Sequence, residues 1–290
     1  MMPLTEKLIL GTVQFGLDYG INNPTGKPST DAVLDILSYA LEKGVTTLDT
    51  ADAYGRADEL IGFFHQHSER KFKVNTKFIC HESKTVIEQL EFSLDKLHID
   101  CINVFFYHRF SDLKNHKSVA NDLQKLKTNS RIRKVGVSIY TNDELKQAIN
   151  ADEVDCIQLP FNLLDNTYQR GALLKEAKRR GKEIQVRSVF LQGLFFKDMS
   201  TYAPYLQPLK KYIAQIKVIA DEANISMAEL ALGYALAEPS IDSVIIGVDT
   251  KAQLEKNLSH ASQLPAEAII KKIDSIAVQE TELLYPYNWK

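Results

Sequence analysis

The stretch TTLDTADAYG, residues 46–55, decides the fold: a short β-branched run stops at an acid, Asp49, and a tyrosine, Tyr54, follows shortly after. Two later segments have the same form. FKVNTKF carries Lys77 where its apolar run stops, and CINVFFYHRF carries His108 in the same place. In a barrel of parallel strands, the carboxyl ends of all strands open on one face. We therefore expect an acid, a phenol, an amine and an imidazole to meet around one small space.

Around these segments, short strand-like runs alternate with longer helix-like runs. We predict strands at 8–13, 46–50, 72–77, 101–107, 134–139, 156–160, 183–189 and 243–247. They are almost continuously apolar, as strands covered on both faces are. We predict helices at 31–43, 58–67, 84–97, 118–129, 142–150, 167–180, 209–223 and 250–261. Eight strands alternating with eight helices indicate an α/β protein with a (β/α)8 TIM barrel, which we expect to form a single domain over residues 1–290.

The alternative for this pattern is an open, doubly wound sheet with a G-x-G-x-x-G turn after its first strand. The segment QFGLDYG follows the first strand and lacks that spacing, so the barrel is the better interpretation. Two more helical patterns exceed the minimum barrel. We interpret 226–237 as an insertion before the last strand and 265–284 as extra C-terminal helical structure that caps the barrel. The segment after the seventh strand should run directly into helix 209–223, which predicts an open mouth.

Composition excludes several classes of protein. The 290 residues are 44% hydrophobic and carry a formal charge of -2, with no basic stripe for nucleic acid and no apolar run that would span a membrane. The N-terminus lacks the pattern of a signal peptide. The widely spaced cysteines Cys80, Cys101 and Cys156 fit reduced packing residues of a cytoplasmic protein. Histidines such as His116 have no cysteine or carboxylate partner at ligand spacing, so we expect no metal site.

Taken singly, three of the four residues have an ordinary structural explanation: a cap for Asp49, packing for Tyr54 and a hydrogen bond for His108. Lys77 is more unusual, because an apolar strand ends in an ammonium. Together they suggest acid–base chemistry. A free phenol has a pKa of about 10 and is a poor acid at neutral pH, but a nearby ammonium such as Lys77 lowers that pKa. Asp49 would orient Lys77 and keep it charged. Neutral His108 would donate a hydrogen bond to a substrate carbonyl oxygen.

With these motifs in order, the chain resembles the aldo-keto reductase family over nearly its whole length. The matching segments are LGTVQFG, LDTADAYG, NTKF, FYHR, VGVSIY, IQLPFNLL, LQGLF and IIGVDTKAQLEKNL, of which LDTADAYG is specific on its own. The resemblance implies a (β/α)8 barrel that binds NAD(P)H without a Rossmann domain. It also implies that Tyr54 is the proton donor, Lys77 modulates its pKa, Asp49 pairs with the lysine and His108 orients the carbonyl.

The resemblance implies a cofactor site that carries over less cleanly. Ser138 and Gln158 match residues that hold the nicotinamide carboxamide, but Ile139 stands where the family usually has asparagine. Arg187 stands where an aromatic residue often stacks on the nicotinamide. A guanidinium plane also stacks on rings, and pairing with a carboxylate at the mouth is an equal alternative.

Further cofactor contacts are implied for residues of the first strand, the loop after the seventh strand and the closing helix: Gly11, Thr12, Ser188, Phe190, Gln192, Gly193, Gly247, Asp249, Gln253, Lys256 and Asn257. Gln253 stands where an arginine often binds the 2′-phosphate. Asp249 suits a free ribose 2′-hydroxyl, whereas Lys251 or Lys256 would restore phosphate binding. We therefore predict NAD(P)H, favouring NADP on family habit, with NAD as the alternative.

The segment FGLDYGINN follows the first strand and should lie at the active face, which makes Asp18, Tyr19 and Asn22 candidate substrate contacts. The predicted reaction is NAD(P)H-dependent reduction of a small-molecule aldehyde or ketone, with a sugar-like carbonyl suggested by the open mouth. One alternative is a cofactor-binding regulatory subunit of the same fold with vestigial activity. Another is a barrel aldolase or isomerase that uses Lys77 as a Schiff base. The sequence predicts no oligomeric state.

Overall fold

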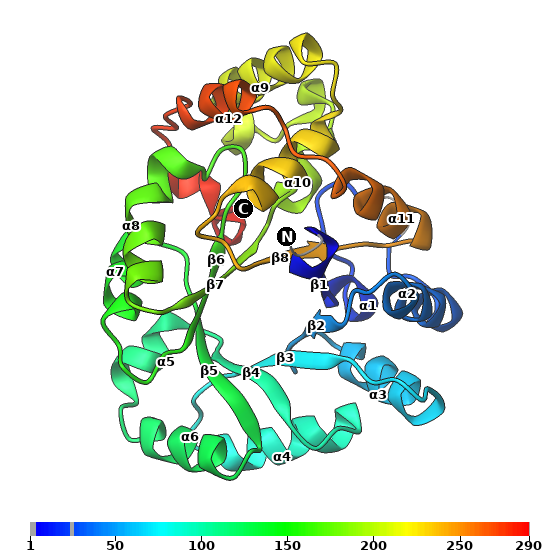
Figure 1. The fold of residues 1–290 in the computed structure, drawn as a ribbon, viewed down its shortest axis with the longest axis vertical. Coiled ribbons are helices and arrows are strands. Elements are labelled where there is room, and N and C mark those ends of the chain that lie inside the picture. The colour runs from blue at the N-terminus through cyan, green and yellow to red at the C-terminus, as the bar shows by residue number, and fades with distance from the viewer. Residues whose placement is uncertain (1–3, 24–25, 290) are drawn as a thin grey trace.

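The computed structural model describes residues 4–23 and 26–289, and its eight strands close into the predicted barrel (Figure 1). Neighbours in sequence pair in parallel, and β1 pairs with β8 to complete the ring. The strands are β1 (Leu8–Gly11), β2 (Thr47–Asp49), β3 (Lys73–Phe78), β4 (Ile102–Tyr107), β5 (Ile132–Ser138), β6 (Cys156–Pro160), β7 (Glu183–Arg187) and β8 (Ser243–Gly247). All eight predicted strands are confirmed, although β1 and β7 each end two residues earlier than predicted and β5 begins two residues earlier.

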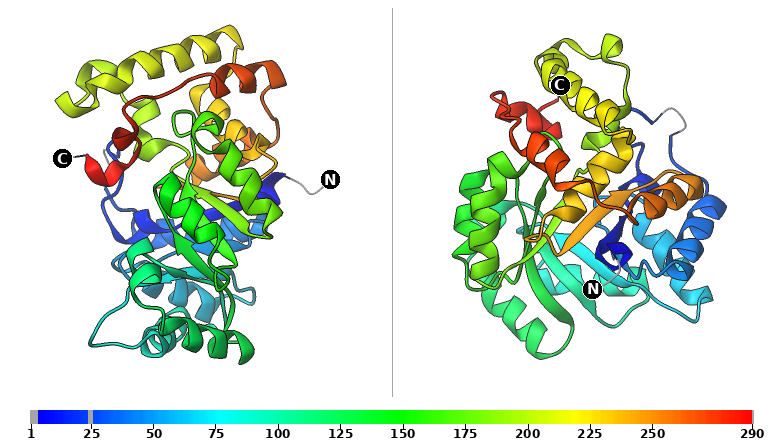
Figure 2. Two further views of the ribbon diagram at one scale, coloured as in Figure 1. Left: turned by 90° about the vertical axis from the view of Figure 1, so that its left-hand side faces the viewer. Right: turned by 45° about the horizontal axis from the view of Figure 1, so that its top comes forward.

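Most of the helices surround the strands (Figures 1 and 2). They are α1 (Val13–Gly16), α2 (Thr30–Glu42), α3 (Ala57–His67), α4 (Val86–Leu97), α5 (Phe110–Asn115), α6 (Val119–Thr128), α7 (Asn142–Ile149), α8 (Thr167–Arg179), α9 (Lys210–Glu222), α10 (Met227–Ala237), α11 (Lys251–His260) and α12 (Glu267–Asp274). Side chains cap several of them. Thr141 and Glu144 form a reciprocal capping box on α7, and Ser29 caps α2. None of the described helices is long and apolar enough to cross a membrane.

The interpretation of 226–237 as an insertion was wrong. This segment forms α10, which packs between β8 and α11 in the ring, whereas α9, predicted as a ring helix, lies outside with α12 (Figure 1). The sequence contains the physical reason. α10 is apolar all round and is buried from Leu230 to Leu236, whereas α9 buries only one face. A helix that is apolar on every side needs contacts on every side.

Two loop predictions also differ from the structure. The segment after β7 does not run directly into α9, because it contains three 3-10 helices: η2 (Leu191–Phe196), η3 (Met199–Thr201) and η4 (Pro204–Leu209). The predicted helix 265–284 is broken into α12, an extended stretch and η5 (Thr281–Leu284), after which η6 (Pro286–Asn288) follows. The connection from β7 to α9 is therefore not the short one from which an open mouth was predicted.

The barrel interior is a packed core. The side chains of Val104, Phe106 and Cys156 form an inner cluster, which is separate from the large core between strands and helices. Gly136 on β5 makes room for Phe106, since a Cβ at that position would lie 2.3 Å from its ring. All eight strands, from residue 8 to residue 247, belong to one sheet. That arrangement supports the single domain over 1–290, which stays a prediction, and residues 1–3, 24, 25 and 290 lie outside the described part.

Candidate active site

The carboxyl ends of the strands surround a cavity of about 560 Å³. It is lined by all four residues proposed for catalysis and by every residue proposed for the cofactor: Asp49, Tyr54, Lys77, His108, Gly11, Thr12, Ser138, Gln158, Arg187, Ser188, Phe190, Gln192, Gly193, Gly247, Asp249, Gln253, Lys256 and Asn257. Those at strand ends meet because the carboxyl ends of all strands open on one face of the barrel, whereas Gln253, Lys256 and Asn257 come from α11.

A buried ion pair lies at the bottom of this cavity. Lys77 Nζ lies 2.6 Å from Asp49 Oδ2 and also donates to the Thr50 carbonyl at 2.9 Å. The second oxygen of Asp49 accepts a hydrogen bond from Gln158 Nε2 at 2.7 Å. Burial disfavours the charged form of Lys77, but the carboxylate beside it outweighs that effect and raises the lysine's pKa. Lys77 is therefore an ammonium at neutral pH, as predicted.

Tyr54 lies beside this ammonium. Lys77 Nζ is 5.3 Å from the centroid of the Tyr54 ring. Burial raises the pKa of Tyr54, while the charge of Lys77 and a hydrogen bond from it lower that pKa. Lys77 thus acts in the predicted direction, but burial prevails, and the net pKa lies above the ordinary value rather than below it. The phenol consequently holds its proton at neutral pH.

Tyr54 is held in place by close backbone packing. The short helix α1 brings Gly16 against the backbone of Tyr54, where a Cβ would lie 1.7 Å from the Tyr54 carbonyl oxygen. Only glycine allows this approach. The turn after β2 is therefore fixed from the N-terminal segment of the chain, which sets where the phenol enters the cavity.

His108 faces Tyr54 across the site. The two rings are nearly perpendicular at 88°, with centroids 6.4 Å apart. Burial, together with the nearby charges of Lys77 and Arg187, lowers the pKa of His108 to about 4. The imidazole is therefore neutral at physiological pH and keeps an N–H with which it can donate a hydrogen bond, as the sequence predicted.

Arg187, at the end of β7, contacts an aromatic ring and a backbone carbonyl of the protein. Its guanidinium lies 4.2 Å from the centroid of the Tyr140 ring and donates to the Ile139 carbonyl at 3.1 Å. No carboxylate of the described residues forms an ion pair with it. The predicted pairing with an acid at the mouth is thus not seen. Stacking on the nicotinamide stays a prediction, with Tyr140 as the partner that orients the guanidinium plane.

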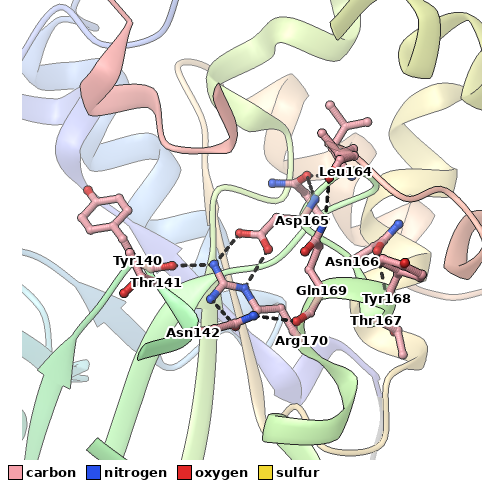
Figure 3. Close-up of polar contacts among 12 residues, drawn as sticks. Tyr140, Thr141, Asn142, Leu164, Asp165, Asn166, Thr167, Tyr168, Gln169 and Arg170 are labelled. Atoms are coloured by element: carbon pink, nitrogen blue, oxygen red, sulfur yellow. Dashed lines mark hydrogen bonds and ion pairs between the residues drawn. The ribbon is translucent and has the colours of Figure 1, made fainter. Parts of the chain in front are cut away.

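The loop after β5, which carries Tyr140, is held by hydrogen bonds from α8. Arg170 on α8 donates to the Tyr140 carbonyl and to Asn142 Oδ1, and its guanidinium is paired with Asp165 (Figure 3). Both partners of this pair are almost fully buried. The position of the Tyr140 ring, and through it that of Arg187, therefore depends on a second buried ion pair outside the cavity.

Gln158 provides a test of whether the cavity fits a nicotinamide. The residue lines the cavity, and its side-chain oxygen is buried with no hydrogen-bond partner among the described residues. An orphaned acceptor of this kind is costly unless a ligand or water satisfies it. The hydrogen bond from Gln158 Nε2 to Asp49 fixes the orientation of the amide, and with it the direction of its unpartnered oxygen. With the hydroxyl of Ser138 on the neighbouring strand, it fits a primary carboxamide.

The loop after β7 has an unusual backbone. Ser188, Leu191 and Gln192 have φ values of 60°, 47° and 56°, and Gly193 follows at 88°. Non-glycine residues in the left-handed region cost energy and concentrate at functional sites, and such turns can direct successive N–H groups at an anion. This loop lines the cavity, although the N–H groups of Leu191 and Gly193 already donate to the carbonyls of Ser188 and Phe190.

At the far end of the cavity, the loop between β8 and α11 carries Asp249. Its carboxylate accepts from Asn23 Nδ2 at 3.2 Å and from Gln253 Nε2 at 3.4 Å. Of the two lysines considered for phosphate binding, Lys256 lines the cavity. Lys251 instead pairs with Asp35 on α2 at 3.1 Å. This end can therefore offer one cation to a phosphate.

Two of the three candidate substrate contacts line the cavity and one does not. Tyr19 and Asn22 line the cavity, and the Tyr19 hydroxyl accepts from Gln192 Nε2 at 3.1 Å. Asp18 is exposed, is not among the lining residues, and accepts from the backbone N–H of Lys27 at 3.0 Å. Adjacent residues of an irregular loop point in different directions, which the sequence does not specify.

Several lining residues were not predicted. They are Val13, Gln14, Gly20, Asn23, Tyr140, Val189, Phe196, Ala228 and Ile245. Tyr140 was within reach of the strand-end argument, because it follows Ser138 by two residues. Phe196 and Ala228 come from η2 and the start of α10, segments whose positions were predicted incorrectly, and no sequence signal pointed to them.

Comparison with known proteins agrees with this geometry. A model of the aldo/keto reductase family matches residues 7–278. Among curated relatives, the chain is 25% identical to the aldo-keto reductase yakc [NADP(+)] of Schizosaccharomyces pombe, over 88% of this chain and 85% of that protein. It is 24% identical to D-arabinose 1-dehydrogenase of Saccharomyces cerevisiae, over 87% and 82%. Among solved structures, an aldo-keto reductase from Bacillus halodurans in its holo form has a TM-score of 0.74 at 19% identity, covering 95% of this chain and 94% of that one, a likeness of fold.

Proposed function

Because the chain belongs to the aldo/keto reductase family, we propose that it is an NAD(P)H-dependent oxidoreductase that reduces an aldehyde or ketone to an alcohol, with Tyr54 as the proton donor. The family consists of oxidoreductases that act on small-molecule carbonyl compounds and use NAD(P)H. The choice of residues, cofactor and substrate within that class is our proposal, and so is its cytoplasmic location.

One observation carries the proposal: the buried lysine of the Lys77–Asp49 ion pair lies beside the Tyr54 ring in the lining of a cavity of about 560 Å³. As the substrate oxygen gains negative charge, Tyr54 donates its proton to it. The phenolate left behind lies next to the ammonium of Lys77, whose charge favours it. Asp49 keeps that ammonium charged and fixed. Lys77 thus stabilises the phenolate after the proton has moved. This role is compatible with a resting phenol that burial keeps protonated.

His108 has a separate role in the proposal. Its neutral imidazole donates a hydrogen bond to the carbonyl oxygen and holds the substrate in the plane needed for reaction. Preorganised donors of this kind act strongly in a buried site, because no solvent has to reorganise around them. The low pKa of His108 keeps this donor uncharged, so it does not compete with Tyr54 to deliver the proton.

The cofactor, when bound, supplies hydride from the nicotinamide ring to the carbonyl carbon. Ser138 and the orphaned oxygen of Gln158 would hold its carboxamide, and the loop from Ser188 to Gly193 would hold its phosphates. Lys256 is the cation that we propose for a 2′-phosphate, which supports NADP as the first choice. Asp249 has hydrogen bonds to Gln253 and Asn23, which leave it less available to a free ribose hydroxyl and make NAD the second choice.

For the substrate we propose a polar, hydroxylated carbonyl compound such as a sugar. The support no longer comes from an open mouth. It comes from the polar groups near the phenol, namely Tyr19, Asn22, His108 and Arg187, all of which line the cavity. A relative of the chain is named D-arabinose 1-dehydrogenase, which agrees with this class. Turnover restricted to small hydrophobic aldehydes would count against it.

The test combines binding and turnover. NADPH and NADH are titrated separately, and the tighter one is used with a panel of simple aldehydes, ketones and keto- or aldo-sugars. We expect Tyr54→Phe to lower kcat/KM by about 10²–10⁴-fold, the usual contribution of a positioned acid, without changing dinucleotide affinity. Tyr168→Phe, at an exposed tyrosine on α8, is the matched control.

The same data separate the alternative functions. A regulatory subunit would bind dinucleotide but show the same slow turnover in wild type and Tyr54→Phe, and the intact set of four residues argues against it. A Schiff-base lysine would give a borohydride-trapped adduct on Lys77 with substrate. The ion pair with Asp49 argues against that reaction, because a charged amine is not a nucleophile.

A further inference from the structure

A second group of reactive side chains lies outside the cavity. Cys80, Asp112 and His116 each offer one ligand atom, and these three atoms all lie within 4.8 Å of one another. None of the three has a role in the reaction proposed above. Asp112, which lies four residues before His116, was overlooked in the sequence, and Cys80 could not be found from spacing because it is more than thirty residues from both. We propose that these three residues form a binding site for one divalent zinc-like cation.

The donor set selects the type of metal. A sulfur, an imidazole nitrogen and a carboxylate oxygen together are characteristic ligands of Zn²⁺. Magnesium and calcium prefer sites made only of oxygen. Three protein ligands leave the fourth tetrahedral position for water, as in zinc sites that are not closed. The structure therefore assigns the site to a borderline transition ion, with zinc as its representative.

The backbone arranges two of the ligands in advance. Asp112 lies in α5 and His116 directly follows that helix, and the spacing of four residues puts both side chains on one face. The helical turn continues to His116, because its N–H donates to the Asp112 carbonyl at 3.0 Å. This pair needs only a third ligand opposite it to complete three-point coordination.

The third ligand comes from the loop after β3. The backbone N–H of Cys80 donates to Asp112 Oδ2 at 3.3 Å, so the loop and the carboxylate are already in contact. That bond orients the carboxylate, as supporting hydrogen bonds do in known metal sites. Asp112 is buried and Cys80 half-buried, whereas His116 is exposed. The imidazole is therefore the ligand that is free to move.

The distances fit with a small adjustment. Metal–ligand distances of about 2.0–2.3 Å place the ligand atoms of a tetrahedral site roughly 3.5 Å apart. The separations here, of up to 4.8 Å, must therefore contract by about 1 Å, which rotation of the exposed His116 side chain can supply. A bound ion would tie the loop after β3 to α5, and these segments follow Lys77 and His108 by three and two residues.

The experiment uses the full chain, reduced and freed of metal by a chelator that is then removed. Zn²⁺ is titrated against a chromophoric competitor, and Co²⁺ is used as a spectroscopic probe. We expect one Zn²⁺ per chain and a thiolate-to-cobalt charge-transfer band in the near ultraviolet. Cys80→Ser and His116→Ala should each weaken Zn²⁺ binding by at least about tenfold, and Cys80→Ser should abolish the cobalt band. Circular dichroism verifies that each variant is folded.

Matched controls are available in the same chain. Cys101→Ser removes another half-buried thiol and His67→Ala another exposed imidazole, and both should leave zinc affinity and the cobalt band unchanged. The proposal is overturned if wild type binds no zinc in competition with the chromophore or gives no charge-transfer band. It is equally overturned if Cys80→Ser and His116→Ala bind zinc as wild type does, or if the control variants lose as much affinity as they do.

Discussion

Two buried ion pairs lie near the carboxyl ends of the strands, Lys77–Asp49 in the lining of the cavity and Arg170–Asp165 outside it. Their closest N–O distances are almost equal, 2.6 Å and 2.7 Å, and no side chain in either pair is more than 6% exposed. Burial and distance alone do not distinguish them. The difference lies in where the remaining donors of each cation point.

The ammonium of Lys77 interacts both with fixed groups of the protein and with a group that lines the cavity. Two of its donors reach Asp49 and the Thr50 carbonyl, and the remaining interaction is with the phenol of Tyr54, which lines the cavity. Its charge is therefore coupled to a group that can gain or lose a proton beside a bound substrate. This pair is positioned to influence proton transfer from Tyr54.

The donors of Arg170 are used within the protein. Two bonds reach the carboxylate of Asp165, one reaches the Tyr140 carbonyl and one reaches Asn142 Oδ1 (Figure 3). Burial lowers the pKa of Arg170, but the Asp165 carboxylate and, to a smaller extent, a hydrogen bond to Tyr285 near the C-terminus raise it above its ordinary value. This pair joins α8, the loop after β5 and the C-terminal segment, and it is placed to hold structure.

The largest effect should come from breaking the pair in the cavity. We expect Lys77→Met to lower kcat/KM by about 10²–10⁴-fold, because the phenolate of Tyr54 loses the cation that stabilises it. Lys77→Met also leaves the Asp49 carboxylate buried without its cation, at a cost of about 3–5 kcal/mol, although Gln158 still donates to it, so urea denaturation must verify that the variant is folded before its dinucleotide affinity is compared. Steady-state kinetics and a dinucleotide titration are the measurements. Turnover within tenfold of wild type would show that Lys77 does not have this role.

Breaking the second pair should affect stability first. Arg170→Met leaves the Asp165 carboxylate buried without a partner, which costs about 3–5 kcal/mol of unfolding free energy. Urea denaturation measures this loss. Arg180→Met is the matched control, because that exposed ion pair with Glu176 should contribute about 1 kcal/mol or less. Equal losses in both variants would mean that burial of the pair does not matter.

A double variant sharpens the comparison. Arg170→Met with Asp165→Leu removes both charges and should recover most of the stability lost in the single variant, to within about 2 kcal/mol of wild type. Dinucleotide affinity should recover less, because the Tyr140 carbonyl still lacks its donor and the ring that orients Arg187 is less constrained. Full recovery of both quantities would show that Arg170 does not position the cofactor end of the loop.

The smallest expected effect concerns pH. The folded pKa of His108 is about 4, against about 6.5 in an unfolded chain. Between these values the unfolded state binds a proton that the folded state does not, so His108 lowers stability as pH falls from about 6.5 toward 4 and has no such effect above that range. His108→Gln should therefore lose less unfolding free energy than wild type between pH 7 and pH 5. An identical loss in both proteins would place the pKa of His108 near its ordinary value.

Strand ends are where prediction from sequence succeeded. Each apolar run that stops at Asp49, Lys77, His108 or Ser138 marks a strand, and parallel strands in a closed barrel bring their carboxyl ends to one face whatever the loops do. No comparable rule fixes the loop conformations or the choice of helices that cover the barrel, so these could not be predicted. The sequence placed Asp18 beside Tyr19 and Asn22, but a turn of the backbone points it to solvent.

The sequence by itself determined the number and direction of the strands, the set of titratable groups at their ends and the residues that line the cavity near them. These features are local, because they depend on apolar runs and their endpoints. Only the tertiary structure decided that α10 rather than α9 completes the ring, that Arg187 stacks on Tyr140, that burial outweighs Lys77 in setting the pKa of Tyr54, and that Cys80 meets Asp112 and His116. Each of these depends on contacts between segments distant in sequence, whose energies arise only when the chain has packed.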